Sequence, residues 1–308
     1  MIIPPNNSLY QPPQPKPIYV PGQHMPIFPG MRGWEEAMKL SRIGTPGSMG
    51  GGMNSMSGVD AGLYGPNGVV VPTPPVAGYN LYTFANAGVF QSNAGTTPAT
   101  ANNDVIGYWT DQSGSGNHLK SSADDSTRPT LQLNQQNTYA CVRFDGSNDI
   151  LAATFAQAQP FTIFIVVKPI AYATPSAHGF YSNTGSGAGG DYPLLYPFST
   201  TGIGALPYSS REDDFGSLST LTAQYQAVGF RWKTGDGYFS YRSVGTTVTG
   251  TGGGVGVVTL TGLRIGTGTG SQGPINCDYL SVLAYPSGLS NADVDTVRDW
   301  YATTVFAF

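Results

Sequence analysis

Charge is scarce in this chain of 308 residues, of which only 10% are Asp, Glu, Lys or Arg. Glutamate occurs only at Glu35, Glu36 and Glu212. Helical cytosolic enzymes are usually richer in lysine, glutamate and leucine, so this composition disfavours that class. A formal net charge of −4 provides no basic surface for nucleic acid or an anionic membrane. We therefore expect no nucleic-acid partner.

Cysteine and long apolar runs are also scarce. Cys141 and Cys277 both sit in apolar, strand-like runs. A disulfide between them is one alternative, but two buried free thiols are favoured because free cysteine is among the most buried side chains. No apolar run is long enough to span a bilayer, so membrane insertion is not expected. The first residues, MIIPPNNSLYQPPQPKP, lack the basic and apolar regions of a secretory signal.

Glycine and proline are abundant, with 42 and 24 copies, and proline is densest before residue 76. Proline fixes φ and removes a hydrogen-bond donor, so residues 1–76 are predicted to form an extended arm. This arm is either a disordered tail or a segment that lies in a groove on a partner. The apolar side chains of the arm favour the second interpretation. We therefore predict that the arm contacts its partner through Tyr10, Ile18, Tyr19, Ile27, Phe28 and Trp34.

One short helix is predicted within the arm, over residues 34–42. Glu35 and Glu36 lie in its first turn, and Lys39 and Arg42 lie in its last, an order that suits the helix dipole. At about two turns it is too short to be stable alone, so it should dock on another surface.

From residue 77 onward the pattern is one of short strands and turns. Residues 161–168 (FTIFIVVK) form the strongest strand candidate because they are β-branched and aromatic. Gly235, Asp236 and Gly237 predict a hairpin turn. One late helix should begin after Ser290, with Asp293 in a capping box. The remaining strand candidates are residues 79–84, 105–109, 141–144, 179–182, 194–198, 225–233, 238–242, 257–260, 263–266 and 278–285. Regular short strands without alternating helices favour an antiparallel β-sandwich.

Two stretches suggest a family. Residues 107–151 contain, in order, Trp109, Asp111, Ser113, Gly114, Gly116, Asn117, Arg128–Pro129, Val142, Phe144, Asp145–Gly146, Asp149 and Leu151. Residues 278–300 add a hydrophobic strand, Leu289–Ser290 and a short helix. This order resembles the concanavalin A-like, laminin-G-like lectin/glucanase family. The resemblance covers residues 77–308 and implies a concanavalin A-like jelly roll, which serves in some proteins as a carbohydrate-binding platform and in others as an inert scaffold.

The residue inventory argues against catalysis. Glucanases of this fold resemble one another in a strand spaced E-x-D-x-x-E, because one carboxylate attacks and another donates a proton. Glu212 is the only glutamate in residues 77–308, and its neighbours Asp213 and Asp214 would point to opposite faces of a strand. No G-x-S-x-G nucleophile motif is present either. We expect no catalytic residues, no cofactor and no enzymatic activity.

Metal binding is similarly disfavoured. His24, His118 and His178 lack zinc-site spacing, and His118 is expected to cap a loop. Asp145, Asn148 and Asp149 could offer oxygens to calcium, but bonding to their own backbone in a turn is the favoured reading. Asp111, Ser113 and Asn117 are expected to form a structural loop. No metal site is therefore predicted.

Carbohydrate binding would need aromatic side chains in a loop-lined site. The aromatic, loop-rich residues 179–215 fit this requirement, although most of their rings are expected in the core. Tyr192, Tyr208 and Arg211 are the predicted glycan contacts.

Three functions remain. The leading hypothesis is a non-enzymatic structural protein of a bacteriophage particle, a head decoration or fibre-like component. Residues 1–76 would bind other virion proteins of the capsid or tail, and the chain would form a homo-oligomer assembled in the host cytoplasm. The alternative is a carbohydrate-binding adhesin of a phage tail, recognising cell-surface glycan. A degenerate glycosidase is the third.

Overall fold

The structure is a computed structural model that describes residues 71–122, 125–171, 180–184, 193–199, 202–207, 224–252, 255, 257, 259–267 and 273–308. The chain divides into two units, Met1–Ser57 and Gly58–Phe308, and all described residues belong to the second. The predicted helix over residues 34–42 and the arm contacts Tyr10, Ile18, Tyr19, Ile27, Phe28 and Trp34 lie outside the described residues.

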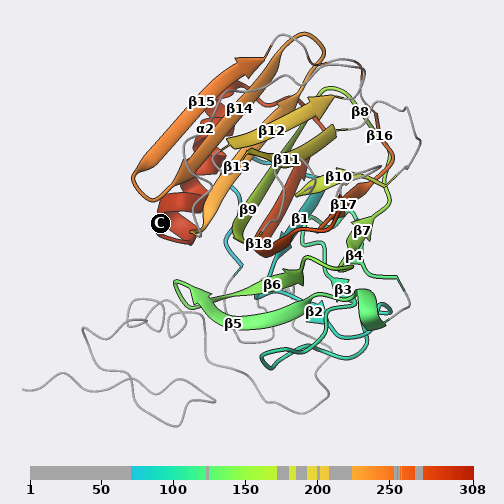
Figure 1. The fold of residues 1–308 in the computed structure, drawn as a ribbon. Coiled ribbons are helices and arrows are strands. Elements are labelled where there is room, and N and C mark those ends of the chain that lie inside the picture. The colour runs from blue at the N-terminus through green and yellow to red at the C-terminus, as the bar shows by residue number, and fades with distance from the viewer. Residues whose placement is uncertain are drawn as a thin grey trace, which may run out of the picture. The chain divides into compact units, whose positions relative to one another are not determined.

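The described residues form an all-β antiparallel sandwich, as predicted (Figure 1). One of its two large sheets, named the inner sheet, has the strand order β15-β14-β13-β9-β18-β6-β5, and β1 also pairs with β18. Its strands are β1 (Leu81–Phe84), β5 (Thr130–Gln136), β6 (Tyr139–Asp145), β9 (Phe161–Ala171), β13 (Gln226–Trp232), β14 (Gly237–Ser243), β15 (Thr246–Gly252) and β18 (Asn276–Tyr285).

The outer sheet has the order β12-β11-β10-β17-β7-β4-β3-β2. Its strands are β2 (Val89–Phe90), β3 (Tyr108–Trp109), β4 (Leu119–Lys120), β7 (Leu151–Ala153), β10 (Tyr181–Asn183), β11 (Pro193–Ser199), β12 (Gly202–Pro207) and β17 (Leu263–Ile265). A separate pair joins β8 (Gln157–Ala158) to β16 (Thr259–Leu260). The helical elements are η1 (Asp125–Thr127), α2 (Asn291–Asp299) and η2 (Trp300–Val305).

Strand β18 organises the inner sheet. One edge pairs with β9 along its whole length, and the other edge is shared by β6 and β1. The first half of β18 pairs with β6, as in Cys277 opposite Phe144, and the second half pairs with β1, as in Val282 opposite Thr83. Residues about 200 positions apart therefore meet in one sheet.

The main core lies between the two sheets, where strand alternation brings inward side chains together. Trp109 and Trp232 are fully buried, as is Tyr181. The indole N–H of Trp232 donates to the Tyr181 hydroxyl over 3.0 Å, which satisfies both buried polar groups. The expectation that most aromatic rings of residues 179–215 lie in the core is thus correct for Tyr181. Cys141 and Cys277 are both buried free thiols, as predicted.

A second core covers the other face of the inner sheet. Helix α2 packs against β13 and β14, and its aspartate Asp295 accepts hydrogen bonds from Tyr238 and Ser240 (Figure 1). The helix begins after Ser290, whose hydroxyl accepts from the Asp293 N–H over 3.2 Å. This confirms the predicted N-cap.

The segment just before β1 packs against this second core. Val71 is buried, and the hydroxyls of Tyr82 and Tyr285 donate to the carbonyls of Pro72 and Val76. Residues 71–76, which sequence analysis placed in the arm, therefore help to stabilise the sandwich. The division of the chain at residue 76 stays a prediction.

Apolar and aromatic patterns in the sequence predicted most strands of the inner sheet, but they did not predict β5 or β15. Strand β15 (TTVTGTG) has few apolar residues because it is an edge strand, exposed along alternate positions. Strand β5 (TLQLNQQ) is the opposite edge and is also polar. Strand β15 pairs with β14, and β5 pairs with β6, through backbone hydrogen bonds. Backbone pairing does not require apolar side chains, so no apolar pattern marks these strands in the sequence.

Two glycines with similar backbone conformations provide a stability test of the core. Gly266 (φ +85°) and Gly114 (φ +82°) would both be strained by a side chain, but only at Gly266 would a Cβ meet neighbours, 2.1 Å from the Phe144 ring. We expect Gly266→Ala to lower the free energy of unfolding by about 1–3 kcal/mol more than Gly114→Ala does. Urea unfolding of both variants measures this difference, and equal losses would contradict the described packing.

Candidate functional site

The outward face of the outer sheet carries one continuous cross-strand row of side chains. In β4 and β17, strand alternation buries Leu119 and Leu263 and places Lys120 and Arg264 on the face away from the core. Register aligns these outward positions across six strands. In order, the row is Phe90, Tyr108, Lys120, Ala152, Arg264 and Ser182.

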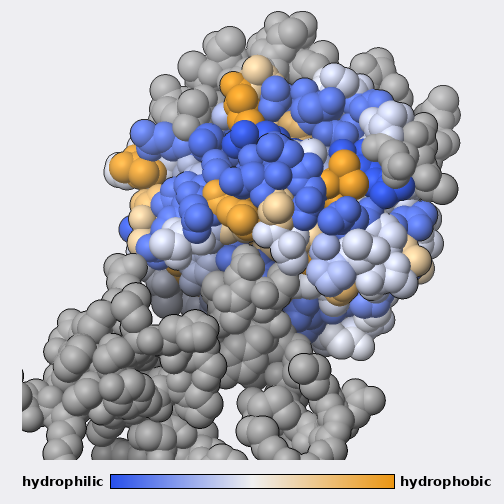
Figure 2. All heavy atoms as spheres, turned by 90° about the horizontal axis from the view of Figure 1, so that it is seen from below, coloured by the Kyte–Doolittle hydropathy of each residue, from blue (hydrophilic) through white to orange (hydrophobic). Residues whose placement is uncertain are grey.

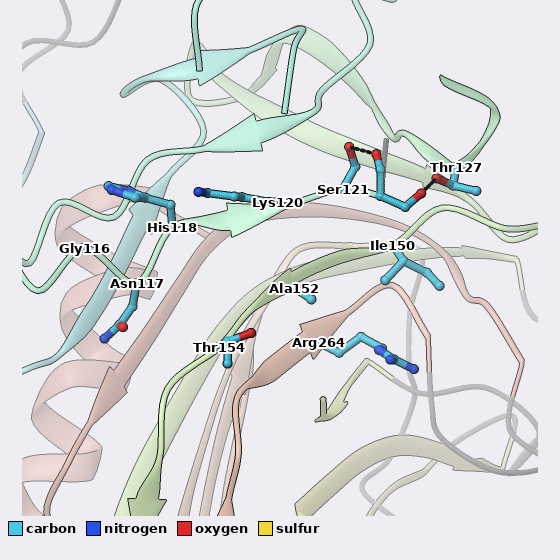
Figure 3. A pocket seen from close by; sticks show the side chains of 11 residues that line it. Gly116, Asn117, His118, Lys120, Ser121, Thr127, Ile150, Ala152, Thr154 and Arg264 are labelled. Carbon is cyan, nitrogen blue, oxygen red and sulfur yellow. Dashed lines mark hydrogen bonds between the residues drawn. The ribbon is translucent and has the colours of Figure 1, made fainter. Parts of the chain in front are cut away.

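A hollow of about 560 Å³ opens over this row (Figure 3). The short side chain of Ala152 lies between the longer Lys120 and Arg264, which leaves space above the sheet. Asn117 and His118 line the hollow from the loop that precedes β4. The volume is within the range of small-ligand sites in proteins.

Tyr108 supports one end of the hollow. Its ring lies 4.8 Å from the His118 ring and 5.8 Å from the Phe90 ring, measured between centroids. The Lys120 ammonium lies 5.2 Å from the Tyr108 centroid, within range of a cation–π interaction. Lys120 is thereby held in place without a carboxylate.

His118 is held as a neutral imidazole. Its Nδ1 accepts the Asp111 N–H over 3.0 Å, so the proton of the neutral ring resides on Nε2. Burial lowers the pKa of His118, and nearby Lys120 acts in the same direction, while the Asp111 carboxylate opposes them. His118 therefore caps its loop, as predicted, and keeps one N–H donor beyond that contact.

Arg264 occupies the other end of the hollow. Its Nε is buried and has no hydrogen-bond partner, and among the described residues no carboxylate pairs with its guanidinium. A buried donor without a partner is costly unless water or a ligand satisfies it. Arg264 is thus a cation whose hydrogen-bonding capacity the described fold does not use.

The Asp111 loop is structural, as predicted. Oδ1 of Asp111 accepts the N–H groups of Tyr82 and Ser113, and Oδ2 accepts the Ser113 hydroxyl and the Asn117 N–H. These bonds connect β1 to the loop that carries His118. The hydrogen bonds of Asp111 therefore hold in place the loop that lines one side of the hollow.

The turn after β6 also matches its structural prediction. Asp145 accepts the Ser147 N–H, and Asp149 accepts the Asp145 N–H over 2.8 Å. Both carboxylates thus bond the local backbone. Across the described part of the chain, no group of three or more His, Cys, Asp or Glu side chains is placed to hold a metal ion.

Other carboxylates of the described residues have structural partners as well. Asp278 is fully buried and receives two hydrogen bonds from Arg143, and Asp236 pairs with Arg231 and Lys233. The α2 carboxylates pair with arginines, Asp295 with Arg298 and Asp299 with Arg242 and Arg298. Asp104 accepts the N–H groups of Thr100 and Ala101, and Asp293 accepts the Ser290 hydroxyl.

The predicted glycan contacts Tyr192, Tyr208 and Arg211 lie outside the described residues. Sequence analysis did not single out Lys120 or Arg264. One signal was available, because LRI at residues 263–265 places a lone arginine between two apolar strand residues, and period-2 alternation turns it outward. The register that aligns Arg264 with Ala152 and Lys120 could not be read from the sequence.

No protein-family model matches the chain, and no curated protein matches it. Solved structures give weak similarities. An arabinofuranosidase complexed with arabinofuranosyl-alpha-1,2-xylobiose has a TM-score of 0.47 at 14% identity, covering 63% of this chain and 50% of its own. Trypanosoma rangeli sialidase in complex with sialic acid has a TM-score of 0.49 at 13% identity, covering 77% and 35%.

The binding domain of botulinum neurotoxin serotype D has a TM-score of 0.46 at 14% identity, covering 73% of this chain and 51% of its own. This chain thus spans about half the length of the arabinofuranosidase and about a third of the sialidase. At these TM-scores the likeness assigns no function to this chain. Among the described helices, none has the length and apolar character needed to cross a membrane.

Asp149 gives this region a testable pH dependence. Burial raises the pKa of its carboxyl to about 6, well above the usual value for an aspartate. The folded state therefore binds this proton more tightly than the unfolded state does, and the resulting stability is lost as pH rises through about 6. We expect Asp149→Asn to reduce the fall in unfolding free energy between pH 5 and pH 7 by about 1 kcal/mol.

Chemical denaturation at the two pH values, with the unsubstituted chain as reference, measures this effect. Asparagine keeps an oxygen that can accept the Asp145 N–H, so the turn is preserved. An unchanged difference between pH 5 and pH 7 in the variant would contradict the assignment to Asp149.

Proposed function

We propose that this protein is a non-enzymatic structural protein of a bacteriophage particle, a head decoration or fibre-like component anchored by residues 1–76. The observation that supports the non-catalytic part is the structural use of the carboxylates. Asp111 is saturated with backbone and hydroxyl donors, and Asp278 is fixed by Arg143. A glycoside hydrolase needs two carboxyl groups facing one substrate, whereas these carboxylates bind backbone N–H groups, hydroxyls and an arginine.

The anchoring part of the proposal is supported by the sequence. Each proline among residues 1–76 fixes its own φ and lacks a backbone donor, and Tyr10, Ile18, Tyr19, Ile27, Phe28 and Trp34 are the proposed apolar contacts. An extended segment of this kind binds through main-chain pairing and side-chain pockets on a partner. Other virion proteins are the proposed partners, and the repeated subunits of a particle would make the chain a homo-oligomer.

A carbohydrate-binding adhesin is the second candidate, and the hollow over Ala152 favours it. The hollow combines neutral hydrogen-bonding groups on Asn117 and Thr154 with the imidazole of His118. A few polar groups fixed around a concave surface are the usual basis of small-ligand recognition.

The anchoring proposal is tested by deleting part of the arm. Because residues 71–76 pack against the sandwich, the deletion should remove residues 1–57 and leave that packing intact. We expect the shortened chain to keep the unfolding midpoint of the full chain and to be absent from purified particles made by the encoding genome. Quantitative mass spectrometry of those particles measures incorporation.

The full-length chain, supplied in the same way, is the control. Normal incorporation of the shortened chain would contradict anchoring by the arm, and absence of the full-length chain from the particles would contradict the virion assignment. Release of reducing sugars from polysaccharides by the purified full chain would contradict the non-enzymatic part.

A further inference from the structure

We propose that the hollow over Ala152 binds an elongated acidic saccharide, whose carboxylates contact Arg264 at one end and Lys120 at the other. This inference rests on the second candidate function, carbohydrate binding, and adds the charge class of the ligand and the residues that recognise it. It does not depend on incorporation into a particle.

The first support is the distribution of charge. Most cations of the described residues pair with a carboxylate, as Arg143, Arg231, Lys233, Arg242 and Arg298 do. Lys120 and Arg264 have no such partner among the described residues, and both line one hollow whose lining contains no carboxylate. Two unneutralised cations around one concave surface favour an anionic ligand.

The second support is the state of Arg264. Its buried Nε lacks a partner, although a buried guanidinium donor normally has one. A planar guanidinium matches a carboxylate through two parallel N–H···O bonds, which are among the stronger hydrogen bonds in proteins. A carboxylate in the hollow could accept hydrogen bonds from the Arg264 guanidinium, including its unpartnered Nε.

The third support is the separation of the two cations. Lys120 and Arg264 stand on strands β4 and β17, on either side of Ala152 on β7, so their backbones are about 10 Å apart. In Figure 3, Lys120 extends toward His118, whereas Arg264 extends away from it, on the side of Ile150. A single small anion is therefore a poor fit, and a longer ligand that crosses Ala152 is favoured.

The neutral lining indicates a hydroxyl-rich ligand between the charged ends. Thr154 provides a hydroxyl, and His118 has an Nε2–H donor because its Nδ1 is occupied by the Asp111 N–H. The Asn117 amide nitrogen donates to the Asn80 carbonyl over 2.6 Å, so Asn117 offers its amide oxygen. Ala152 and Ile150 are the apolar residues of the lining, and apolar atoms make up more of the lining surface than polar atoms do. Thr154 lies between the two cations, and His118 and Asn117 lie beyond Lys120 (Figure 3). A hydroxyl group and apolar carbon atoms between two cations suit an acidic oligosaccharide, which has both hydroxyls and C–H groups on its rings.

The test is calorimetric titration of the full-length chain with a panel of carboxylate-bearing oligosaccharides. The methyl esters of the same compounds are the matched ligands, because they keep the sugar rings and remove the charge. We expect an acid to bind at least about tenfold more tightly than its ester. Binding should weaken as the salt concentration rises, because ions screen the charges.

Three substitutions localise the site. Arg264→Gln and Lys120→Gln each remove one cation, and Ala152→Leu fills the hollow without changing charge; each should weaken binding of the acid at least about tenfold. Lys120 is exposed, so its variant tests the site even if Arg264→Gln impairs folding. Lys233→Gln is the charge-matched control, since Lys233 lies in the exposed β13–β14 turn, and it should leave affinity unchanged.

Each contrary result has a distinct meaning. Equal affinity for acid and ester would overturn the acidic ligand while leaving carbohydrate binding intact. No binding to any panel member, or tighter binding to a single-stranded oligonucleotide used as a polyanion control, would overturn the inference. An equal loss in Lys233→Gln would also overturn it, because attraction would then be nonspecific.

Discussion

The pairing of β18 with three other strands is the constraint on which the described structure depends. Val282 lies opposite Ile165 of β9 on one side and Thr83 of β1 on the other, so segments far apart in the chain close into one sheet. Because β18 is buried along most of its length, its inward residues fix the register of the core. The outer sheet and α2 then pack against the two faces of a single inner sheet.

The outer sheet shows what this arrangement makes available. Its inward residues form the core together with the inner sheet, whereas its outward residues contribute little to the hydrophobic core. Lys120 and Arg264 are such residues, and neither side chain belongs to the hydrophobic core. Figure 2 shows one face of the sandwich on which hydrophobic residues lie in small separate groups among hydrophilic ones. Within that view, specific polar contacts are a more plausible basis for recognition than a broad apolar patch.

Sequence reasoning captured the features that depend on local pattern. The apolar runs of β9 and β18, the Gly235 turn, the Ser290 cap and the local bonding of Asp111 all follow from neighbouring residues. Edge strands such as β15 were missed because backbone pairing, rather than side-chain burial, places them in the sheet. The hollow was missed because its two cations are 144 positions apart in the chain and meet only through strand register. Tyr192, Tyr208 and Arg211 remain predicted contacts outside the described residues.

Both the second candidate function and the further inference require that the outward face of the outer sheet recognise a ligand without converting it chemically. A crystal structure of the full chain soaked with an acidic oligosaccharide tests it most directly. We expect an intact ligand across Ala152, with a carboxylate within hydrogen-bonding distance of the Arg264 guanidinium. A ligand bound elsewhere on the chain, or one found cleaved in the hollow, would contradict it.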